Sequence, residues 1–582
     1  MTILASLANA YDRLPDAPPF GYSSEKIGFL ISLYEDGTVA NVTDWRVGEG
    51  AKKAPRPMFV PQGAKRTSGI APNFLWDKTS YVLGVTAGEG RRLSEERVAF
   101  KNRHLEILSA ETDPGLVAFR RFLETWTPET FNALGWPEEM KDQNVAFVLE
   151  SERHQHIRIH ERPAARKLWS QMRAAKDAAT AACLVDGEQR AIARLHPAIK
   201  GVWGGQSSGG SIVAFNAEAY ESYGHQQGDN APVSELAAFK YTTALNIFLG
   251  KDSGHRIQIG DASTVVWADA SDIKSSEFSE DLFAKMLADD DNTEDDNIQS
   301  KRVGEVLQGL REGRPLKDLN PDLAQGMRFY VLGLAPNAAR ISIRFWIEDD
   351  FTAITRNYQK YVSELKISPP PREPYPALWR YVLETATQHK RENIPPKLAG
   401  DWFRSILTGT RYPQTLFSTV LMRIRADKDV NAYRVGILKA LLIRNCNKKE
   451  TPVALDPDFT DKGYLLGRLF AVYERIQTAA LGNVNATIKD RFYGAASAQP
   501  QKVFPLIIRN AQHHLSKLGK TSGGLRHYFD SQIEEIMGLL SPGDAPFPTT
   551  LSLSEQALFN LGYYHQRTRK KDDAAQTQET AQ

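Results

Sequence analysis

The chain has 582 residues, of which 42% are hydrophobic and 24% charged, and its formal net charge is +2; these values are ordinary for a soluble globular protein of about two to four domains. No stretch approaches the roughly 18 apolar residues of a membrane span, and the start of the chain lacks the features of a signal peptide. Only two cysteines occur, Cys183 and Cys446, which excludes a disulfide framework or a four-cysteine zinc site and favours the cytoplasm.

The N-terminal part of the chain, residues 1–366, predicts a mixed α/β domain. Residues 26–45 are typical of a strand, an Asp-Gly turn and a second strand. No internal repeat is visible. Further strands are expected at 255–269 and 338–349, and helices at 1–14, 113–126 and 161–180.

A basic segment follows at residues 52–84. Its Lys and Arg residues alternate with Pro and Gly, which favours loops over a helix. It continues into an Asn-Phe-Leu-Trp run, in which an Asn side chain can read a base edge and an aromatic ring can stack on a base or wedge a base step. The alternative is that Phe74, Trp76 and Tyr81 are aromatic residues of the core; we expect a core position for Leu75 and Trp76. The residues predicted to contact nucleic acid are Lys65, Arg66, Asn73, Phe74 and Lys78.

Residues 200–224 read KGVWGGQSSGGSIVAFNAEAYESYG and are rich in small and neutral polar residues. Glycines let a backbone approach another molecule closely, and Gln, Ser and Asn side chains offer neutral hydrogen-bond donors and acceptors. Such a loop suits recognition of phosphates, sugars or base edges better than catalysis, and an ordered loop with a purely structural role is the alternative. The residues expected to recognise a ligand are Gln206, Ser207, Ser208 and Asn216.

The common catalytic motifs are absent from the sequence: it has no Walker A loop, no GxGxxG after a strand, no GxSxG and no HExxH. His154, His156 and His160 lie close together, but no neighbouring Cys or carboxylate pair completes a metal shell. The acidic run from Asp289 to Asp296 is typical of a solvated loop rather than of a metal site. We therefore expect no catalytic residue, no cofactor and no metal.

The segment ISPPPREPYP at residues 367–376 marks the predicted domain boundary, because its five prolines favour extended backbone and cannot lie inside a helix. Beyond it, residues 377–582 predict helices with short connections, which is typical of an antiparallel bundle. Residues 377–571 contain 28 Lys and Arg against 16 Asp and Glu. The sequence thus predicts an α+β protein, with a mixed N-terminal domain, a Pro-rich linker and a basic C-terminal helical bundle.

Two helices of this bundle place basic residues beside an apolar stripe. Ammonium and guanidinium groups in such positions suit a nucleic-acid backbone, because they replace the counterions condensed on phosphates. A solvated helix face without a partner is the alternative. The residues predicted to bind phosphates are Tyr464, Arg468 and Arg475 in the first helix and Lys502 and Arg509 in the second, where His513 shares their face.

Several segments, in the same order over essentially the whole chain, are similar to one protein family. APNFLWDKTSYVLG, QSSGGSIVAFNAEAYESYG and YLLGRLFAVYERIQ resemble the Csd-type large subunit of the type I-C CRISPR surveillance complex, called Cascade. The resemblance implies a non-catalytic subunit of an antiviral defence complex that contacts the CRISPR RNA, the double-stranded target DNA and its displaced strand. It also implies protein partners, namely a ferredoxin-like subunit, repeated backbone subunits, a small subunit and a separate helicase–nuclease, and no contact with a membrane.

Within such a subunit, the resemblance assigns recognition of the motif flanking the target (PAM) and opening of the duplex into an R-loop to the N-terminal domain. It assigns the path of the displaced strand to the C-terminal bundle, which resembles the small subunit. Met422 is a candidate internal translation start for a small subunit. Two alternatives stay open: a metal-dependent nuclease that uses the acidic run and the histidines, and an architectural subunit that contacts only protein and guide RNA.

Overall fold

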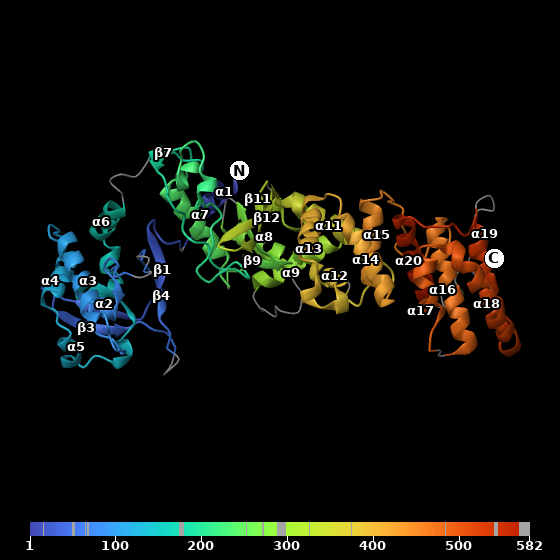
Figure 1. Cartoon of the computed structure of the whole chain (residues 1–582), viewed down its shortest axis with the longest axis horizontal. Coiled ribbons are helices and arrows are strands. Elements are labelled where there is room, and N and C mark those ends of the chain that lie inside the picture. Colours follow the sequence, from blue (N-terminus) through green and yellow to red (C-terminus); the bar gives the residue numbers. More distant parts are fainter. Residues whose placement is uncertain are drawn as a thin grey trace. The chain divides into compact units, whose positions relative to one another are not determined.

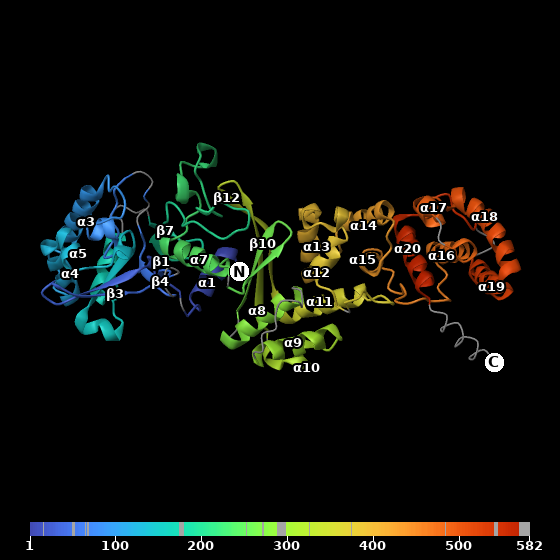
Figure 2. The ribbon, with the colours of Figure 1, turned by 90° about the horizontal axis from the view of Figure 1, so that it is seen from below.

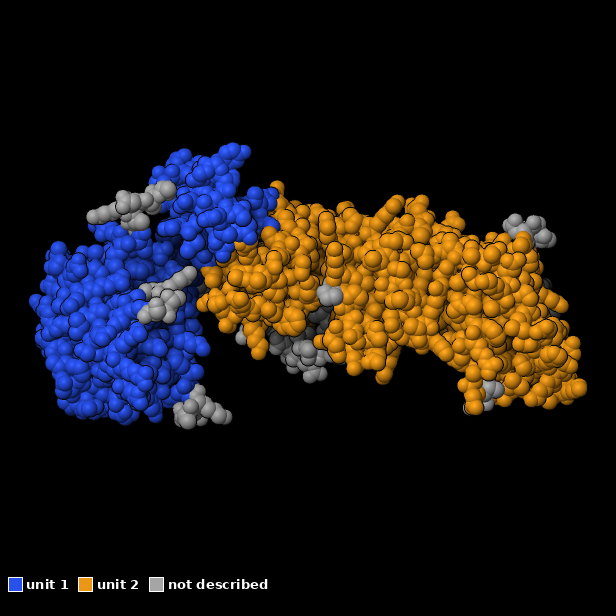
Figure 3. All heavy atoms as spheres, in the orientation of Figure 1, with its two compact units in different colours: residues 1–197, 213–245 blue, residues 198–212, 246–582 orange. Residues whose placement is uncertain are grey.

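The computed structural model describes residues 1–15, 17–48, 53–63, 66, 69–173, 180–251, 253–269, 273–287, 298–324, 326–373, 375–482, 485–540 and 545–569. The chain forms two compact units, which Figure 3 distinguishes by colour. Unit 1 comprises residues 1–197 and 213–245, and unit 2 comprises residues 198–212 and 246–582. Small sheets with helices occupy the N-terminal half and helices follow, so the predicted α+β class is confirmed.

The larger sheet of unit 1 contains the predicted hairpin, formed by β2 (Phe29–Leu33) and β3 (Val39–Asp44) around a turn in which Gly37 has a φ of +88°. β6 pairs with β2 in parallel, and a separate antiparallel ribbon joins β1 to β4. These pairings between distant segments were not predicted. The sheet has the order β3 (Val39–Asp44), β2 (Phe29–Leu33), β6 (Asn144–Leu149) and β5 (Asp77–Lys78); the ribbons are β1 (Tyr22–Ile27) with β4 (Arg56–Pro61), and β7 (Thr180–Ala182) with β8 (Gln189–Ala191).

Local sequence explains where the helices of unit 1 begin. For α4, Asp113 caps the first turn by accepting hydrogen bonds from the backbone N–H groups of Gly115 and Leu116 at 3.0 and 3.1 Å, and Pro114 occupies the first helical position. The predicted helices at 1–14 and 113–126 are confirmed, and the one at 161–180 is confirmed over Pro163–Arg173, beyond which residues 174–179 lie outside the described residues. The helices, labelled in Figure 1, are α1 (Ile3–Tyr11), α2 (Thr79–Val82), α3 (Leu93–Ile107), α4 (Pro114–Thr125), α5 (Glu129–Ala133), α6 (Pro163–Arg173) and α7 (Glu235–Phe248).

His104, on α3, is fully buried in the core of unit 1 against the rings of Phe74, Phe100 and Phe119. Its Nε2 accepts a hydrogen bond from the backbone N–H of Leu75 at 3.0 Å, so Nδ1 carries the proton and donates to the Phe100 carbonyl at 2.8 Å. Burial lowers the pKa of this imidazole to about 3. The ring is therefore a neutral part of the core.

Unit 2 contains an antiparallel sheet with the order β12-β11-β10-β9, on which helices pack: α8 on β10, and α11 and α13 on β12 (Figure 2). The strands are β9 (Arg256–Ile259), β10 (Ala262–Asp269), β11 (Arg328–Asn337) and β12 (Arg340–Asp350). The helices are α8 (Ile273–Leu287), α9 (Ile298–Arg311), α10 (Leu316–Leu319), α11 (Phe351–Leu365), α12 (Leu378–Leu383), α13 (Pro396–Thr408), α14 (Gln414–Asp427), α15 (Ala432–Arg444), α16 (Lys462–Leu481), α17 (Ile488–Ala496), α18 (Pro500–Thr521), α19 (Gly523–Leu539) and α20 (Leu553–Thr568).

Glycines bring the backbones of α16 and α20 into contact. A Cβ on Gly467 would lie 2.0 Å from the carbonyl oxygen of Phe559, and one on Gly463 would lie 2.3 Å from that of Glu555. Because both contacts advance by four residues along both helices, α16 and α20 run parallel. The expected antiparallel packing therefore does not hold for this pair, whose chain connection runs through α17, α18 and α19.

The Pro-rich segment at 367–376 lies inside unit 2, so the two compact units do not divide there. The N–H of Ser368 donates to the carbonyl of Val453 at 2.8 Å, and the hydroxyl of Tyr564 donates to the carbonyl of Pro369 at 2.7 Å. One continuous apolar core includes strands before the segment and helices after it. The segment is a packed connection within a unit. Across the described ranges, none of the helices is long and apolar enough to cross a membrane.

We expect the stability of unit 1 to decrease at acid pH through His104. Because its folded pKa of about 3 lies below the value of 6.5 for a free histidine, its contribution is complete above pH 6.5 and is lost as the pH falls toward 3. The slope is up to about 1.4 kcal/mol per pH unit. His104→Gln, which keeps a donor and an acceptor, should flatten the pH dependence of urea unfolding between about pH 7 and pH 5. Equal slopes in both proteins would contradict a neutral buried ring.

Candidate nucleic-acid interface

Arg66 is held in place by the fold of unit 1. It forms an ion pair with the buried carboxylate of Asp77, and its Nε donates to the carbonyl of Ala71 at 2.8 Å. Its guanidinium carbon lies 4.0 Å from the ring centroid of Tyr81. Burial raises the pKa of Asp77, and the nearby Arg66 opposes that shift. Arg66 still leaves 26% of its side chain exposed, whereas Lys65 lies outside the described residues.

Asn73 and Phe74 lie in the interior. Their exposed fractions are 6% and 1%, and the ring of Phe74 stacks on that of Trp169 with centroids 5.6 Å apart. The backbone N–H of Asn73 donates to Oδ2 of Asp77 at 2.9 Å. Both side chains were predicted to contact nucleic acid. Their burial conflicts with that prediction, because the ring of Phe74 and the turn that carries Asn73 are part of the core of unit 1. Trp76 is a core residue, as expected.

The exposed part of the basic segment lines a polar cavity of about 700 Å³ beside the first turn of α3. Partial positive charge at a helix N-terminus favours anions. The carboxylate of Asp142 is hydrogen-bonded within the wall of the cavity: it accepts hydrogen bonds from the hydroxyl of Thr86 at 2.6 Å and the N–H of Ala87 at 3.1 Å. The charged residues of its lining are Arg66, Lys78, Arg91 and Arg92 with Glu96 and Asp142. Arg66 and Arg91 also have carboxylate partners outside the lining, Asp77 and Glu89.

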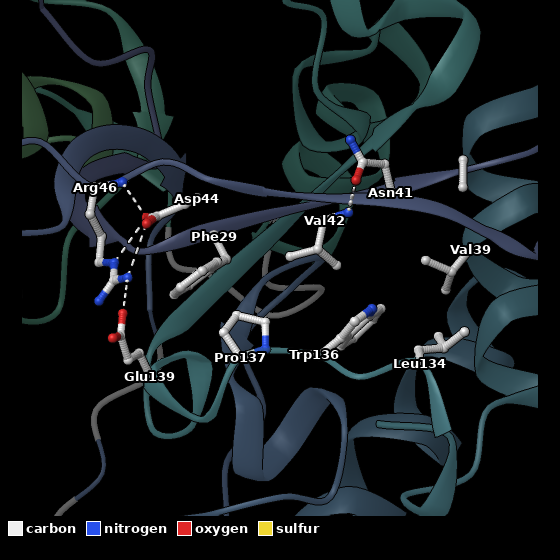
Figure 4. A pocket seen from close by; sticks show the side chains of 11 residues that line it. Phe29, Val39, Asn41, Val42, Asp44, Arg46, Leu134, Trp136, Pro137 and Glu139 are labelled. Carbon is white, nitrogen blue, oxygen red and sulfur yellow. Dashed lines mark hydrogen bonds and ion pairs between the residues drawn. The ribbon is translucent and has the colours of Figure 1, made fainter. Parts of the chain in front are cut away.

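A second cavity of unit 1, of about 410 Å³, opens between β3 and the segment after α5 (Figure 4). Phe29 and Trp136 form apolar parts of its wall, and at one end Arg46 contacts Asp44 at 2.9 Å and Glu139 at 2.7 Å. Arg46 and its neighbours hold the pKa of Asp44 well below its usual range. Because two carboxylates neutralise the cation of this cavity, it is not suited to phosphates.

A polar side chain occupies a backbone donor of β3, which lies at the edge of its sheet, and another occupies a donor just beyond the strand. Asn41 accepts a hydrogen bond from the N–H of Val42 at 2.8 Å, and Asp44 accepts one from the N–H of Arg46 at 3.1 Å (Figure 4). An added strand would have to displace these side chains. These contacts disfavour pairing of this edge with another chain.

The Gly- and Ser-rich loop at 198–212 belongs to unit 2 and presents its polar residues at its tip. Ile199 and Gly210 exchange backbone hydrogen bonds of 2.8 and 2.9 Å that close the loop. Gly209 has a φ of +89°, and a Cβ there would lie 2.7 Å from the carbonyl oxygen of Ile199. The loop is thus ordered, and its exposed side chains include Gln206, Ser207 and Ser208. Asn216 is also exposed but belongs to unit 1.

The structure gives no support to a metal site. The acidic run at 289–296 lies outside the described residues. His154 and His156 are exposed, whereas His160 is buried with its Nε2 3.0 Å from the carbonyl oxygen of Phe59. In the part of the chain that the structure describes, no group of three His, Cys, Asp or Glu residues is arranged to hold a metal ion. The nuclease alternative therefore has no ligand cluster among these residues.

Tyr464 and Arg468 are fully buried, contrary to the prediction that they bind phosphates. Arg468 donates from Nε to Gln566 at 3.1 Å and from Nη1 to the carbonyl of Pro457 at 3.2 Å, and it forms an ion pair with Glu535. The cause is that α19 and α20 cover the side of α16 that the sequence pattern left open. Arg475 is only partly buried, 6.0 Å from the ring of Tyr528.

α18 presents a basic face. Residues Phe504, Ile507, Ala511, Leu515 and Leu518 are buried and form one side of the helix. The helix contains no Asp or Glu. Among the described residues, no carboxylate forms an ion pair with its Lys and Arg side chains. The opposite side exposes the predicted Lys502, Arg509 and His513, and also Lys517 and Lys520.

Lys517 and Lys520 were missed by sequence reasoning, although the signal was present. They continue the helical spacing of Lys502, Arg509 and His513 for two further turns. From Lys502 to Lys520 the face is about 27 Å long at 1.5 Å per residue. This length covers several consecutive phosphates of one nucleic-acid strand.

A family model described as CRISPR-associated protein (Cas_Csd1) matches residues 7–570 of the chain. No curated protein matches the chain. The matched range includes the polar cavity, the loop at 198–212 and the whole of α18.

We expect Arg468→Ala to destabilise unit 2 by about 3 kcal/mol, because it leaves the buried partners of the guanidinium unpaired. Arg509→Ala, on the exposed face of α18, should change the unfolding free energy by less than about 0.5 kcal/mol. Urea unfolding of both variants measures the difference. A stable Arg468→Ala protein with weakened DNA binding would show that Arg468 faces the ligand instead.

Proposed function

The chain belongs to the CRISPR-associated Csd1 family, and we propose that it is the non-catalytic large subunit of a type I-C RNA-guided surveillance complex in the cytoplasm. In this role it contacts the CRISPR RNA, the flanking motif of double-stranded target DNA and the displaced strand. It assembles with ferredoxin-like, backbone and small subunits and recruits a helicase–nuclease. Membership of the family supports a role in a CRISPR complex. The charge and burial of the surfaces of the chain support the division of tasks that follows.

The observation that carries the proposal is the acid-free exposed face of α18. Lys and Arg side chains with no carboxylate on the same helix gain most by releasing counterions from phosphates. A face of this kind follows a strand without reading its bases, because it offers charges and no directional hydrogen-bond pattern for base edges. We therefore assign the displaced DNA strand to this face.

Recognition of the flanking motif is assigned to two places, each within one unit. In unit 1, the polar cavity beside α3 supplies Arg66 and Lys78 for phosphate contacts that position the duplex. In unit 2, the tip of the loop at 198–212 supplies Gln206, whose amide can read a base edge. The buried Asn73 and Phe74 take no part.

Opening of a duplex requires only modest help from such contacts. Guide pairing yields a heteroduplex about as stable as the DNA duplex it replaces, so strand exchange is nearly balanced. A few kcal/mol from contacts with the displaced strand decide the direction. A binding subunit without catalysis can therefore control target opening.

We expect the triple variant Lys502→Ala, Arg509→Ala and Lys517→Ala to weaken binding of single-stranded DNA. The slope of log K against log salt should become shallower by about 2, because each phosphate contact with a single strand contributes about 0.7. Fluorescence anisotropy with labelled oligonucleotides over a salt series measures it. The matched control removes three exposed cations elsewhere in unit 2, Lys317, Arg356 and Lys449, and should leave the slope unchanged. Equal slopes for the two variants would refute the assignment to α18.

We expect Gln206→Ala and Lys78→Ala to have different effects on the binding of duplexes with correct and altered flanking motifs. Loss of an amide that reads a base should reduce the discrimination between the two duplexes, by about 1–3 kcal/mol for a two-bond contact. Loss of a phosphate contact should lower the affinity for both duplexes equally. Band-shift titration of the assembled complex tests this. If Gln206→Ala lowered both affinities equally, the loop would have no role in reading sequence.

A further inference from the structure

Residues 218–229 of unit 1 turn back on themselves through a single β-bridge between two short 3-10 helices and hold Tyr223 in the solvent; this segment is called the hairpin below. Ser222 and His225 pair across the tip, and the two residues between them, Tyr223 and Gly224, have φ values of +54° and +79°. Positive φ at both central positions is typical of a type I′ turn, which favours Asn, Asp or Gly at the first of them. A bulky side chain there is unfavourable. Tyr223 is nevertheless 100% exposed, so burial gives no compensation within the chain.

Polar contacts fix the base of this hairpin. Asn230 accepts a hydrogen bond from the N–H of Ser222 at 3.1 Å and donates from Nδ2 to the carbonyls of His225 and Gln227, both at 3.1 Å. Gly228 packs so closely on the preceding chain that a Cβ would lie 2.1 Å from the carbonyl oxygen of Ala193. The exposed tyrosine therefore stands on an ordered support, which lowers the entropy lost when it binds.

The segment that carries Tyr223 has an excess of negative charge, with one neighbouring cation, Arg194, whose Nε donates to the side-chain oxygen of Gln227. No Lys or Arg occurs between Lys200 and Lys240. The hairpin carries three exposed carboxylates, on Glu218, Glu221 and Asp229. Phosphates would be repelled here, in contrast to the basic face of α18. A protein surface with Lys and Arg around an apolar slot complements both the ring and the carboxylates.

We propose that the hairpin 218–229 is a docking element that inserts Tyr223 into a basic surface of a neighbouring protein subunit. This inference rests on the proposed function, because a subunit that holds guide RNA is the partner with the required positive charge. Tyr223 supplies the central contact, since a rigid, amphipathic ring loses little conformational freedom on binding. The carboxylates guide its approach and set its orientation.

Tyr223→Asn is the decisive variant. Asn suits the left-handed turn better than Tyr, so the variant should fold at least as stably as the original chain, while the ring is lost. The full chain is titrated against the guide-RNA-bearing subunits assembled without it, with biolayer interferometry as the measurement. We expect roughly 30-fold weaker binding, the loss typical of a central interface tyrosine. The matched control is Tyr34→Ala, which removes a 53% exposed tyrosine elsewhere in unit 1 and should bind normally.

A second variant tests the charges. Glu218→Gln, Glu221→Gln and Asp229→Asn together should slow association and reduce its dependence on salt, with a smaller effect on dissociation. Binding of single-stranded DNA by the isolated chain should be the same in all variants. Normal assembly of Tyr223→Asn, or weaker DNA binding by it, would overturn the docking role and leave the proposed function standing. If the unaltered chain did not join the guide-bearing subunits, the proposed function would fail together with the inference.

Discussion

The close contact between the backbones of α16 and α20 determines the architecture of the C-terminal helices. Gly467 on α16 and Gly562 on α20 each face a carbonyl oxygen of the other helix, at distances where a Cβ would clash. The contact leaves α16 enclosed, with no side open to solvent along most of its length. α18, which packs on the outside of α16, keeps one free side and becomes the surface available to a ligand. Glycine positions thus decide which helix can bind.

The two basic helices show what sequence can and cannot predict. In α18, a single apolar stripe faces a single basic one, so periodicity alone located Lys502 and Arg509 on the surface. In α16, the same reasoning failed for Arg468, because its partner Gln566 lies almost a hundred residues later and nothing local signals that α20 covers it. Asn73 was misjudged for a related reason, since only the tertiary structure shows that its turn is fixed by Asp77 and by His104. Pairing of neighbouring strands, such as β2 with β3, could be predicted from the sequence. The parallel pairing of β2 with β6 could not, because the two strands are far apart in the chain.

Charge separates the surfaces of the molecule into two kinds. α18 carries cations without a carboxylate, whereas the stretch between Lys200 and Lys240 carries carboxylates without a cation. Such segregation has a cost in each unit through self-repulsion, and it lets one surface attract a ligand that the other repels. The near-zero net charge of the whole chain conceals this arrangement. Composition averaged over the sequence is therefore a poor guide to its binding properties.

The capped edge of β3 has a consequence for the life of the protein before its complex exists. A subunit made in excess waits in a crowded cell, where open strand edges are templates for intermolecular sheet growth. Asn41 occupies one donor of this edge and Asp44 one just beyond it, so the edge is a poorer template for an added strand. Two short polar residues thereby disfavour the addition of a strand at this edge, independently of anything the subunit later binds.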